Sequence, residues 1–137
     1  MTVEESIVIA APPEDVFAVV ADLERAPEWQ RSLESVDVER GIEVRRLGGR
    51  RQEARFNVAE SDPPRRLVIE SHGGSARARA AMTLEPQGDG TRLAFSLDLQ
   101  LSGAARFGAG MIRGSVEREA RDNLATLKRL VESERGA

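Results

Sequence analysis

Residues 93–101 read LAFSLDLQL. Large apolar side chains occupy every second position, and alanine, serine, aspartate or glutamine occupies the positions between them. Because successive side chains of a β-strand point to opposite faces, this period of two predicts a strand with one apolar and one solvated face. The preceding segment, 75–85, alternates in the same way, and its apolar face consists of Ala76, Ala78, Ala80, Met82 and Leu84.

More strands are predicted upstream, between turns marked by glycine, proline and aspartate. Six consecutive hairpin strands are expected at 34–40, 42–47, 51–60, 66–72, 75–85 and 91–101. A first strand at 3–10 brings the total to seven. The apolar face of the last two strands continues upstream through Ala54, Phe56, Val58, Leu67, Ile69 and Ser71.

A sheet with one apolar face must be covered, and region 104–133 offers a long helix for that purpose. It contains no proline, and Val116, Ala120, Leu124, Leu127 and Val131 recur at three- and four-residue intervals. The first half of the helix differs, because four glycines lie among Phe107, Met111 and Ile112. Each glycine costs about 1 kcal/mol of helix propensity relative to alanine. A kink, a close backbone approach or a loose entrance is therefore expected there.

Two short helices are predicted after the first strand. Pro12 and Pro13 followed by two acids suit a helix start, and this helix should run to about Asp22. The second follows Glu24, is interrupted near Pro27 and carries Trp29. The elements together predict an α+β helix-grip fold, in which a curved seven-stranded antiparallel sheet wraps around a long C-terminal helix. With 137 residues and 40% hydrophobic content, the chain fits one domain, 1–137.

The composition argues against several classes of protein. A net charge of −3 and a sequence pI of about 5.3 argue against a general nucleic-acid binder. The absence of cysteine excludes disulfides and thiolate chemistry, and a single histidine removes most histidine metal sites. The arginine-rich region 40–79 is interpreted as a solvated sheet face rather than an anion-binding patch. We expect no metal and no cofactor.

The chain is expected to be cytoplasmic, because it begins without a basic and apolar signal segment and has no apolar run of roughly 20 residues. No transmembrane segment is therefore predicted. Either a monomer or a homodimer is compatible with the sequence.

Several short motifs follow one another in a familiar order: APPEDVF at 11–17, DLERAPEW at 22–29, DPPRRL at 62–67, LEP at 84–86 and GDGTRL at 88–93. In this order the chain resembles the START-like superfamily, which includes the Bet v 1 allergens and bacterial polyketide cyclase/dehydrase-like (SRPBCC) proteins. The resemblance implies a cavity between the sheet and the long helix. It implies no particular reaction, because fold alone does not determine chemistry. The connection at 39–41 is shorter than is usual in that superfamily, which would shorten one edge of the pocket.

The predicted cavity lies between the last four strands and the first half of the long helix, with a volume of about 300–1,000 Å³. We expect Ala78 and Ala80 to form its floor, because alanine replaces large aliphatic residues there. Its walls would be Phe56, Leu67, Ile69, Phe95 and Leu97, and its lid would be Phe107, Met111 and Ile112. The alternative is that large side chains, Trp29 among them, fill this space and leave no cavity.

Reactive groups are scarce on the predicted inner face. His72 should face outward by alternation, and only Ser71 and Arg46 offer polar groups. Arg46 would point into the cavity mouth if Ile42 faces the dry side; otherwise it extends to water. Trp29 could line the entrance or simply pack after Pro27.

A small hydrophobic ligand, such as a lipid, quinone or polyketide, is therefore the expected partner, bound without catalysis. The alternatives are a polyketide aromatase/cyclase or dehydratase, in which shape alone directs the reaction, and a protein-interaction module.

Overall fold

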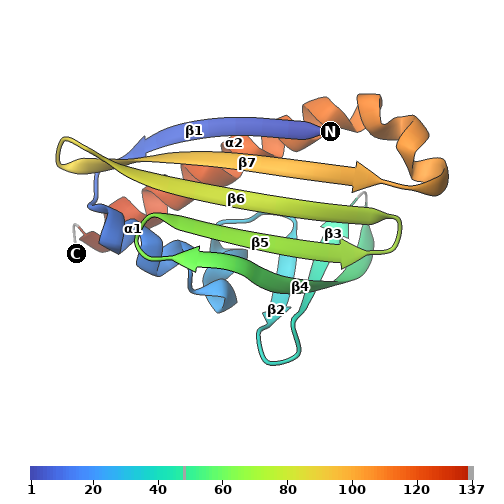
Figure 1. The fold of residues 1–137 in the computed structure, drawn as a ribbon, viewed down its shortest axis with the longest axis horizontal. Helices are drawn as coiled ribbons and strands as arrows, with labels where there is room; N and C mark the ends of the chain where they lie inside the picture. The colour runs from blue at the N-terminus through green and yellow to red at the C-terminus, as the bar shows by residue number, and fades with distance from the viewer. Residues whose placement is uncertain (48, 136–137) are drawn as a thin grey trace.

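The structure is a computed structural model that describes residues 1–47 and 49–135. All predicted elements are present in the expected order (Figure 1). They are β1 (Thr2–Ile9), α1 (Pro13–Val20), the 3₁₀ helix η1 (Leu23–Glu28), β2 (Leu33–Asp37), β3 (Ile42–Leu47), β4 (Arg50–Asp62), β5 (Arg66–Gly73), β6 (Ala76–Gln87), β7 (Gly90–Leu101), the 3₁₀ helix η2 (Gly103–Gly108) and α2 (Ala109–Arg135).

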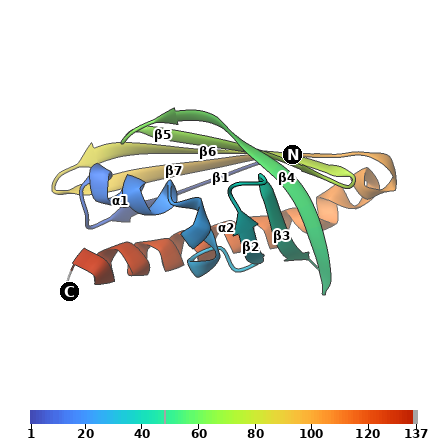
Figure 2. The same ribbon diagram turned by 90° about the horizontal axis from the view of Figure 1, so that it is seen from below.

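The seven strands form one antiparallel sheet in the order β1-β7-β6-β5-β4-β3-β2. The sheet curves over α1 and α2, which lie on the same side of it (Figure 2). A register shift between Val58 and Glu60 interrupts β4, and such a bulge allows a strand to bend. The bend carries β3 and β2 toward α2. The predicted helix-grip fold is thereby confirmed.

Strand pairing confirms the predicted apolar face. Leu97 and Leu99 of β7 lie opposite Ala80 and Ala78 of β6. On β1, Val3, Ile7 and Ile9 share this face, and Glu5 lies between Val3 and Ile7.

The hydrophobic core fills only one end of the space between sheet and helices, the end where α1 lies (left in Figure 1). There α1, the second half of α2 and the sheet bury a common cluster, in which Leu93 and Leu127 are completely inaccessible to solvent. Burying a side chain of this size stabilises a fold by about 1.5–3 kcal/mol.

Helix α2 also runs along the free edge of β1. Arg113 and Lys128 donate hydrogen bonds to the carbonyl oxygens of Thr2 and Val8, each at 2.9 Å. The backbone N–H of Ala10 donates to a carboxylate oxygen of Glu132 at 2.7 Å. Within residues 1–47 and 49–135, no helix combines the length and apolar character needed to cross a membrane.

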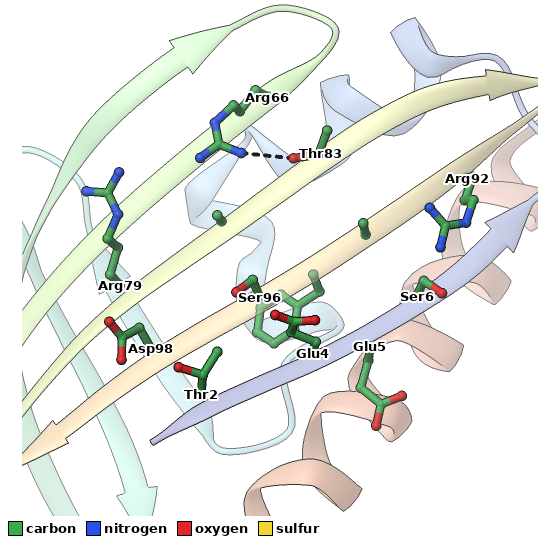
Figure 3. A pocket seen from close by; sticks show the side chains of 13 residues that line it. Thr2, Glu4, Glu5, Ser6, Arg66, Arg79, Thr83, Arg92, Ser96 and Asp98 are labelled. Atoms are coloured by element: carbon green, nitrogen blue, oxygen red, sulfur yellow. Dashed lines mark hydrogen bonds between the residues drawn. The ribbon is translucent and has the colours of Figure 1, made fainter.

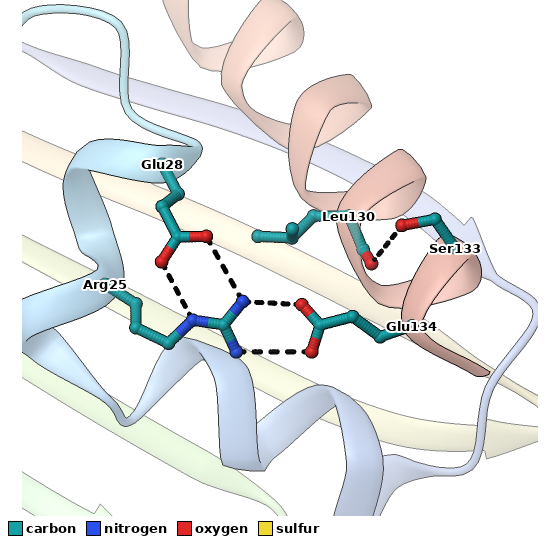
Figure 4. A network of polar contacts seen from close by, with 5 residues as sticks. All are labelled: Arg25, Glu28, Leu130, Ser133 and Glu134. Atoms are coloured by element: carbon teal, nitrogen blue, oxygen red, sulfur yellow. Dashed lines mark hydrogen bonds and ion pairs between the residues drawn. The ribbon is translucent and has the colours of Figure 1, made fainter. Parts of the chain in front are cut away.

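Arg25 of η1 holds the C-terminal end of α2 (Figure 4). Arg25 Nε donates to Glu28 Oε2 at 2.9 Å, and Arg25 Nη1 donates to Glu134 Oε1 at 3.2 Å. These hydrogen bonds lower the pKa of both carboxyl groups and raise the pKa of the guanidinium. The network therefore fixes the η1 loop against the last turn of α2.

Candidate functional site

The end of the sheet away from α1 remains partly open to solvent. Ala78, Ala80, Leu97 and Leu99 face the helix side of the sheet, yet all four are only half-buried. The reason lies in α2, whose buried stripe begins only at Ala120. Every residue from Ala109 to Glu119 is at least partly exposed. The first half of the helix therefore does not close over the inner face as its second half does.

The predicted floor residues, Ala78 and Ala80, and two of the predicted walls, Phe56 and Leu97, come together on this open surface. Ala78 lies between Ser71 of β5 and Leu99 of β7, and Phe56 of β4 lies opposite Ser71. Ala80 lies one pair further along, toward the core.

Two of the predicted walls, Ile69 and Phe95, pack against the core cluster, and Leu67 lies within it. The open surface is thus a direct continuation of the core.

The predicted lid is wrong, because its side chains do not lie over the sheet. Phe107 and Met111 are 81% and 89% exposed, and Ile112 is also exposed. Figure 1 shows α2 beginning beyond the N-terminal end of β1. A side chain at Gly108 or Gly110 would meet nothing within 4 Å, so these glycines do not serve close packing. The segment before α2 instead forms the 3₁₀ helix η2, which projects from the molecule.

Of the two orientations considered for Arg46, the structure shows the one directed to water, so Arg46 does not point into the cavity mouth. The pairing of β3 with β4 places Glu43 opposite Ala54 and Arg45 opposite Gln52, so Glu43 and Arg45 face inward. Arg46 lies on the other face, where its Nε donates to Glu34 at 2.8 Å. This ion pair lowers the pKa of Glu34 and keeps Arg46 at the surface.

The sequence did not predict the polar side chains that face inward beside β3 instead of Arg46. We call it the Arg45 cluster, and it consists of Gln30, Ser32, Glu43, Arg45 and Glu119. Arg45 donates to Ser32 Oγ at 3.1 Å and to Gln30 Oε1 at 2.9 Å, and its Nε lies 3.4 Å from Glu43 Oε1. Ser32 in turn donates to Glu119 of α2 at 3.0 Å. The cluster joins the sheet to the first half of α2.

Glu43 is unusual in this cluster because the residue is only 7% exposed. A carboxylate offers about four acceptor positions, and Arg45 reaches it only through two long contacts of 3.4 Å. Buried charged groups are normally paired and hydrogen-bonded closely. Glu43 therefore retains capacity to accept a hydrogen bond from a group placed beside it.

The structure also places the remaining candidates. Trp29 is buried in the core cluster, in agreement with a packing role, and its Nε1 has no hydrogen-bond partner among the described residues. His72 is exposed on the outer face, as alternation predicted. Within the described part of the chain, no group of three or more potential metal ligands comes together.

The outer face of the sheet carries a hollow of about 680 Å³ (Figure 3). Small residues such as Ala81 and Ser96 form its base, and charged side chains surround it. Arg66 donates to Thr83 at 3.0 Å, and Arg79 donates to Glu70 at the same distance. The hollow is open and polar, as expected for the solvated face predicted from the sequence.

Comparison with known proteins places this geometry in context. The model of the family described as "Polyketide cyclase / dehydrase and lipid transport" matches residues 1–132. A search of curated proteins finds no match.

Similar solved structures include TTHA0849 from Thermus thermophilus, with a TM-score of 0.78 and 24% identity over 98% of this chain and 99% of that one. Ara h 8.0201 has a TM-score of 0.74 and 17% identity over 97% and 98% of the two chains. The Zhui aromatase/cyclase from Streptomyces has a TM-score of 0.72 and 19% identity over 96% and 93%. These identities show a shared fold. The family match over residues 1–132, together with the helix-grip sheet, shows that this chain belongs to the polyketide cyclase/dehydrase and lipid transport family of the SRPBCC superfamily.

Proposed function

We propose that the protein binds a small hydrophobic ligand between the inner face of β4–β7 and the first half of α2, without catalysing a reaction. The observation that carries this proposal is the half-buried apolar surface around Ala78 and Leu99, which continues directly from the core. Large contiguous apolar surfaces on soluble proteins commonly mark binding sites. Covering such a surface with a ligand contributes about 25 cal/mol for each Å² of apolar area removed from water.

The Arg45 cluster supports a ligand with one polar end. Arg45 can donate a hydrogen bond through an N–H that the cluster does not use, whereas Glu43 can accept one. A suitable ligand would place its apolar part on Ala78 and Ala80 and its hydroxyl or carbonyl group beside the Arg45 cluster. Ligand sites typically combine an apolar lining with a few polar groups that orient the ligand.

The first experiment is native mass spectrometry of freshly purified protein, in which a retained small molecule would identify the ligand. The second is titration with the fluorescent probe N-phenyl-1-naphthylamine. Ala78→Phe places a ring on the floor and should weaken saturable probe binding at least tenfold. Ala81→Phe adds the same ring to the outer face of the same strand, so it should leave probe binding unchanged.

Two results would overturn the proposal. Saturable probe binding could be absent in the wild-type protein, or both phenylalanine variants could bind the probe equally well. In either case the open inner face is not the binding surface.

A second candidate function is a polyketide cyclase. The observation that favours it is the inward-facing pair of Glu43 and Arg45 beside the apolar surface. A guanidinium can polarise a carbonyl, and a carboxylate within reach can accept a proton. Conversion of a poly-β-ketone substrate by the wild-type protein, with loss of conversion in Glu43→Gln, would favour this function. Binding of the same substrate without conversion would favour the carrier.

A further inference from the structure

Residues 102–116 present an unusual surface at the open end of the molecule. Phe107 and Met111 project almost completely into water, and Ile112 is exposed beside them. The segment is tied to the turn between β5 and β6, because the N–H of Ser102 donates to the carbonyl oxygen of Ser75 at 2.9 Å. The exposed side chains therefore lie at the same end of the sheet as the pair of Ala76, which begins β6, and Leu101, which ends β7.

The charge of this segment is opposite to that of the whole protein. Residues 102–116 contain Arg106 and Arg113 and no acidic residue, whereas the net charge of the chain is −3. Arg113 is paired with Glu117, directly after the segment, at 3.2 Å, so Arg106 is the cation that the segment offers to a partner. The remaining residues of the segment are apolar, glycine or serine. Arg106 lies over the ring of Phe107, 5.4 Å from its centroid, so cationic and apolar groups share one projection.

We propose that residues 102–116 dock onto the surface of an anionic phospholipid bilayer. In this arrangement Phe107 and Met111 enter the boundary between headgroups and acyl chains, and Arg106, which lies over the Phe107 ring, faces the lipid phosphates. Interfacial segments combine these features: apolar side chains on one surface, basic residues beside them, and too little total hydrophobicity to span the membrane.

A bilayer fits this surface better than a protein does. Stable protein interfaces bury about 800 Å² on each partner over a well-packed patch with a polar rim. Here the apolar side chains stand on a projecting turn, and the residues between them are largely glycine and alanine. A fluid headgroup layer can accommodate such a projection without a complementary shape. The positive charge of Arg106, on a projection without acidic residues, would also favour the approach of this end of the molecule to an anionic surface.

This inference extends the proposed function, because a bilayer is a source or destination for a hydrophobic ligand. Vesicle binding is nevertheless measured without added ligand. A failure to bind vesicles would contradict membrane docking but not the proposed ligand site. A failure to bind the fluorescent probe would contradict the ligand site but not membrane docking.

The test is co-flotation of the full-length protein with vesicles of phosphatidylcholine and phosphatidylglycerol at a ratio of about 7:3, in low salt. We expect binding that decreases on vesicles of phosphatidylcholine alone and in about 0.5 M salt. The double variant Phe107→Ser/Met111→Ser should bind at least tenfold more weakly. Val38→Ser removes a 46% exposed side chain in the turn between β2 and β3, so it should bind as the wild type does.

A second measurement reports insertion directly. The chain has no cysteine, so Phe107→Cys and Val38→Cys can each be labelled at a single position with an environment-sensitive nitrobenzoxadiazole dye. On addition of vesicles we expect a blue shift and increased emission at position 107 and no change at position 38. Both variants replace exposed side chains, and their thermal unfolding verifies that they fold.

Three results would overturn the inference. The wild-type protein could fail to float with anionic vesicles, or the double variant could bind as well as the wild type. Sedimentation could instead reveal a dimer that the double variant dissociates, in which case a second copy of the chain covers these side chains.

Discussion

Replacing Arg45 with methionine tests whether the Arg45 cluster lies inside the protein. Glu43 is nearly inaccessible to solvent, and Arg45 is the only positively charged group that hydrogen-bonds to it among the described residues. At 3.4 Å two unit charges attract each other by about 5 kcal/mol at an effective dielectric constant of about 20. Removing one partner of a fully buried pair costs about 3–5 kcal/mol. The Arg45 side chain remains 28% exposed, which weakens the interaction by solvent screening. We therefore expect Arg45→Met to lower the free energy of unfolding by about 2–3 kcal/mol.

The double variant Glu43→Leu/Arg45→Met removes both charges and should lie within about 1 kcal/mol of the wild type, because no uncompensated carboxylate remains. Urea unfolding of the wild type, Arg45→Met, Glu43→Leu and the double variant completes a double-mutant cycle. Arg46→Met is the matched control. It removes the neighbouring arginine on the outer face, whose partner Glu34 is exposed, and should change stability little.

Additive effects of the two single substitutions would contradict this reasoning. They would mean that the two charged groups are solvated independently. The Arg45 cluster would then offer no buried polar site for a ligand.

Other consequences can be measured in the same way. Leu127→Ala should lower the free energy of unfolding by about 2–5 kcal/mol, because this side chain is fully buried. Leu99→Ala should lower it by clearly less, because Leu99 is only half-buried. Equal losses in urea unfolding would contradict an open end of the sheet. Gly114→Ala should raise stability by about 0.5–1 kcal/mol, since a side chain there meets nothing within 4 Å; a lower melting temperature would show that α2 packs differently. Arg25 holds the pKa of Glu134 below its ordinary value of 4.5, so the stability that this pair contributes is present above pH 4.5 and is lost as pH falls further. On acidification the Arg25→Gln variant should therefore lose less stability than the wild type, and parallel pH profiles of the two proteins would rule this out.

The strands and the apolar face could be predicted because their alternation is nearly unbroken. In β7 every second residue from Leu93 to Leu101 is large and apolar, and the observed pairs match this pattern. The C-terminal helix could be predicted for the same reason, although only its part from Ala120 onward buries a stripe. Periodicity identifies which residues can face a core, but it does not show where that core ends.

The orientation of β3 could not be taken from its own pattern. Ile42 and Val44 suggest that their side of the strand is the dry one, yet Glu43 and Arg45 face inward. Hairpin register contained the missing information. With two residues between Leu47 and Arg50, position 43 falls opposite Ala54, which had already been assigned to the inner face. The hydrogen bonds of the Arg45 cluster to the loop before β2 and to α2 depend on tertiary contacts, which alternation does not contain.

The position of α2 along β1 has a consequence for assembly. In an open sheet the outermost strand exposes unpaired backbone groups, onto which a strand of another molecule can add. Side chains of α2 already occupy three such groups on this edge. They are the carbonyl oxygens of Thr2 and Val8 and the N–H of Ala10, the residue after β1. The helix thus protects the sheet from growth into fibrils on this side. Loss of Lys128 would free the carbonyl oxygen of Val8, and loss of Glu132 would free the N–H of Ala10, so each change would return one backbone group of this edge to those that another strand can pair with.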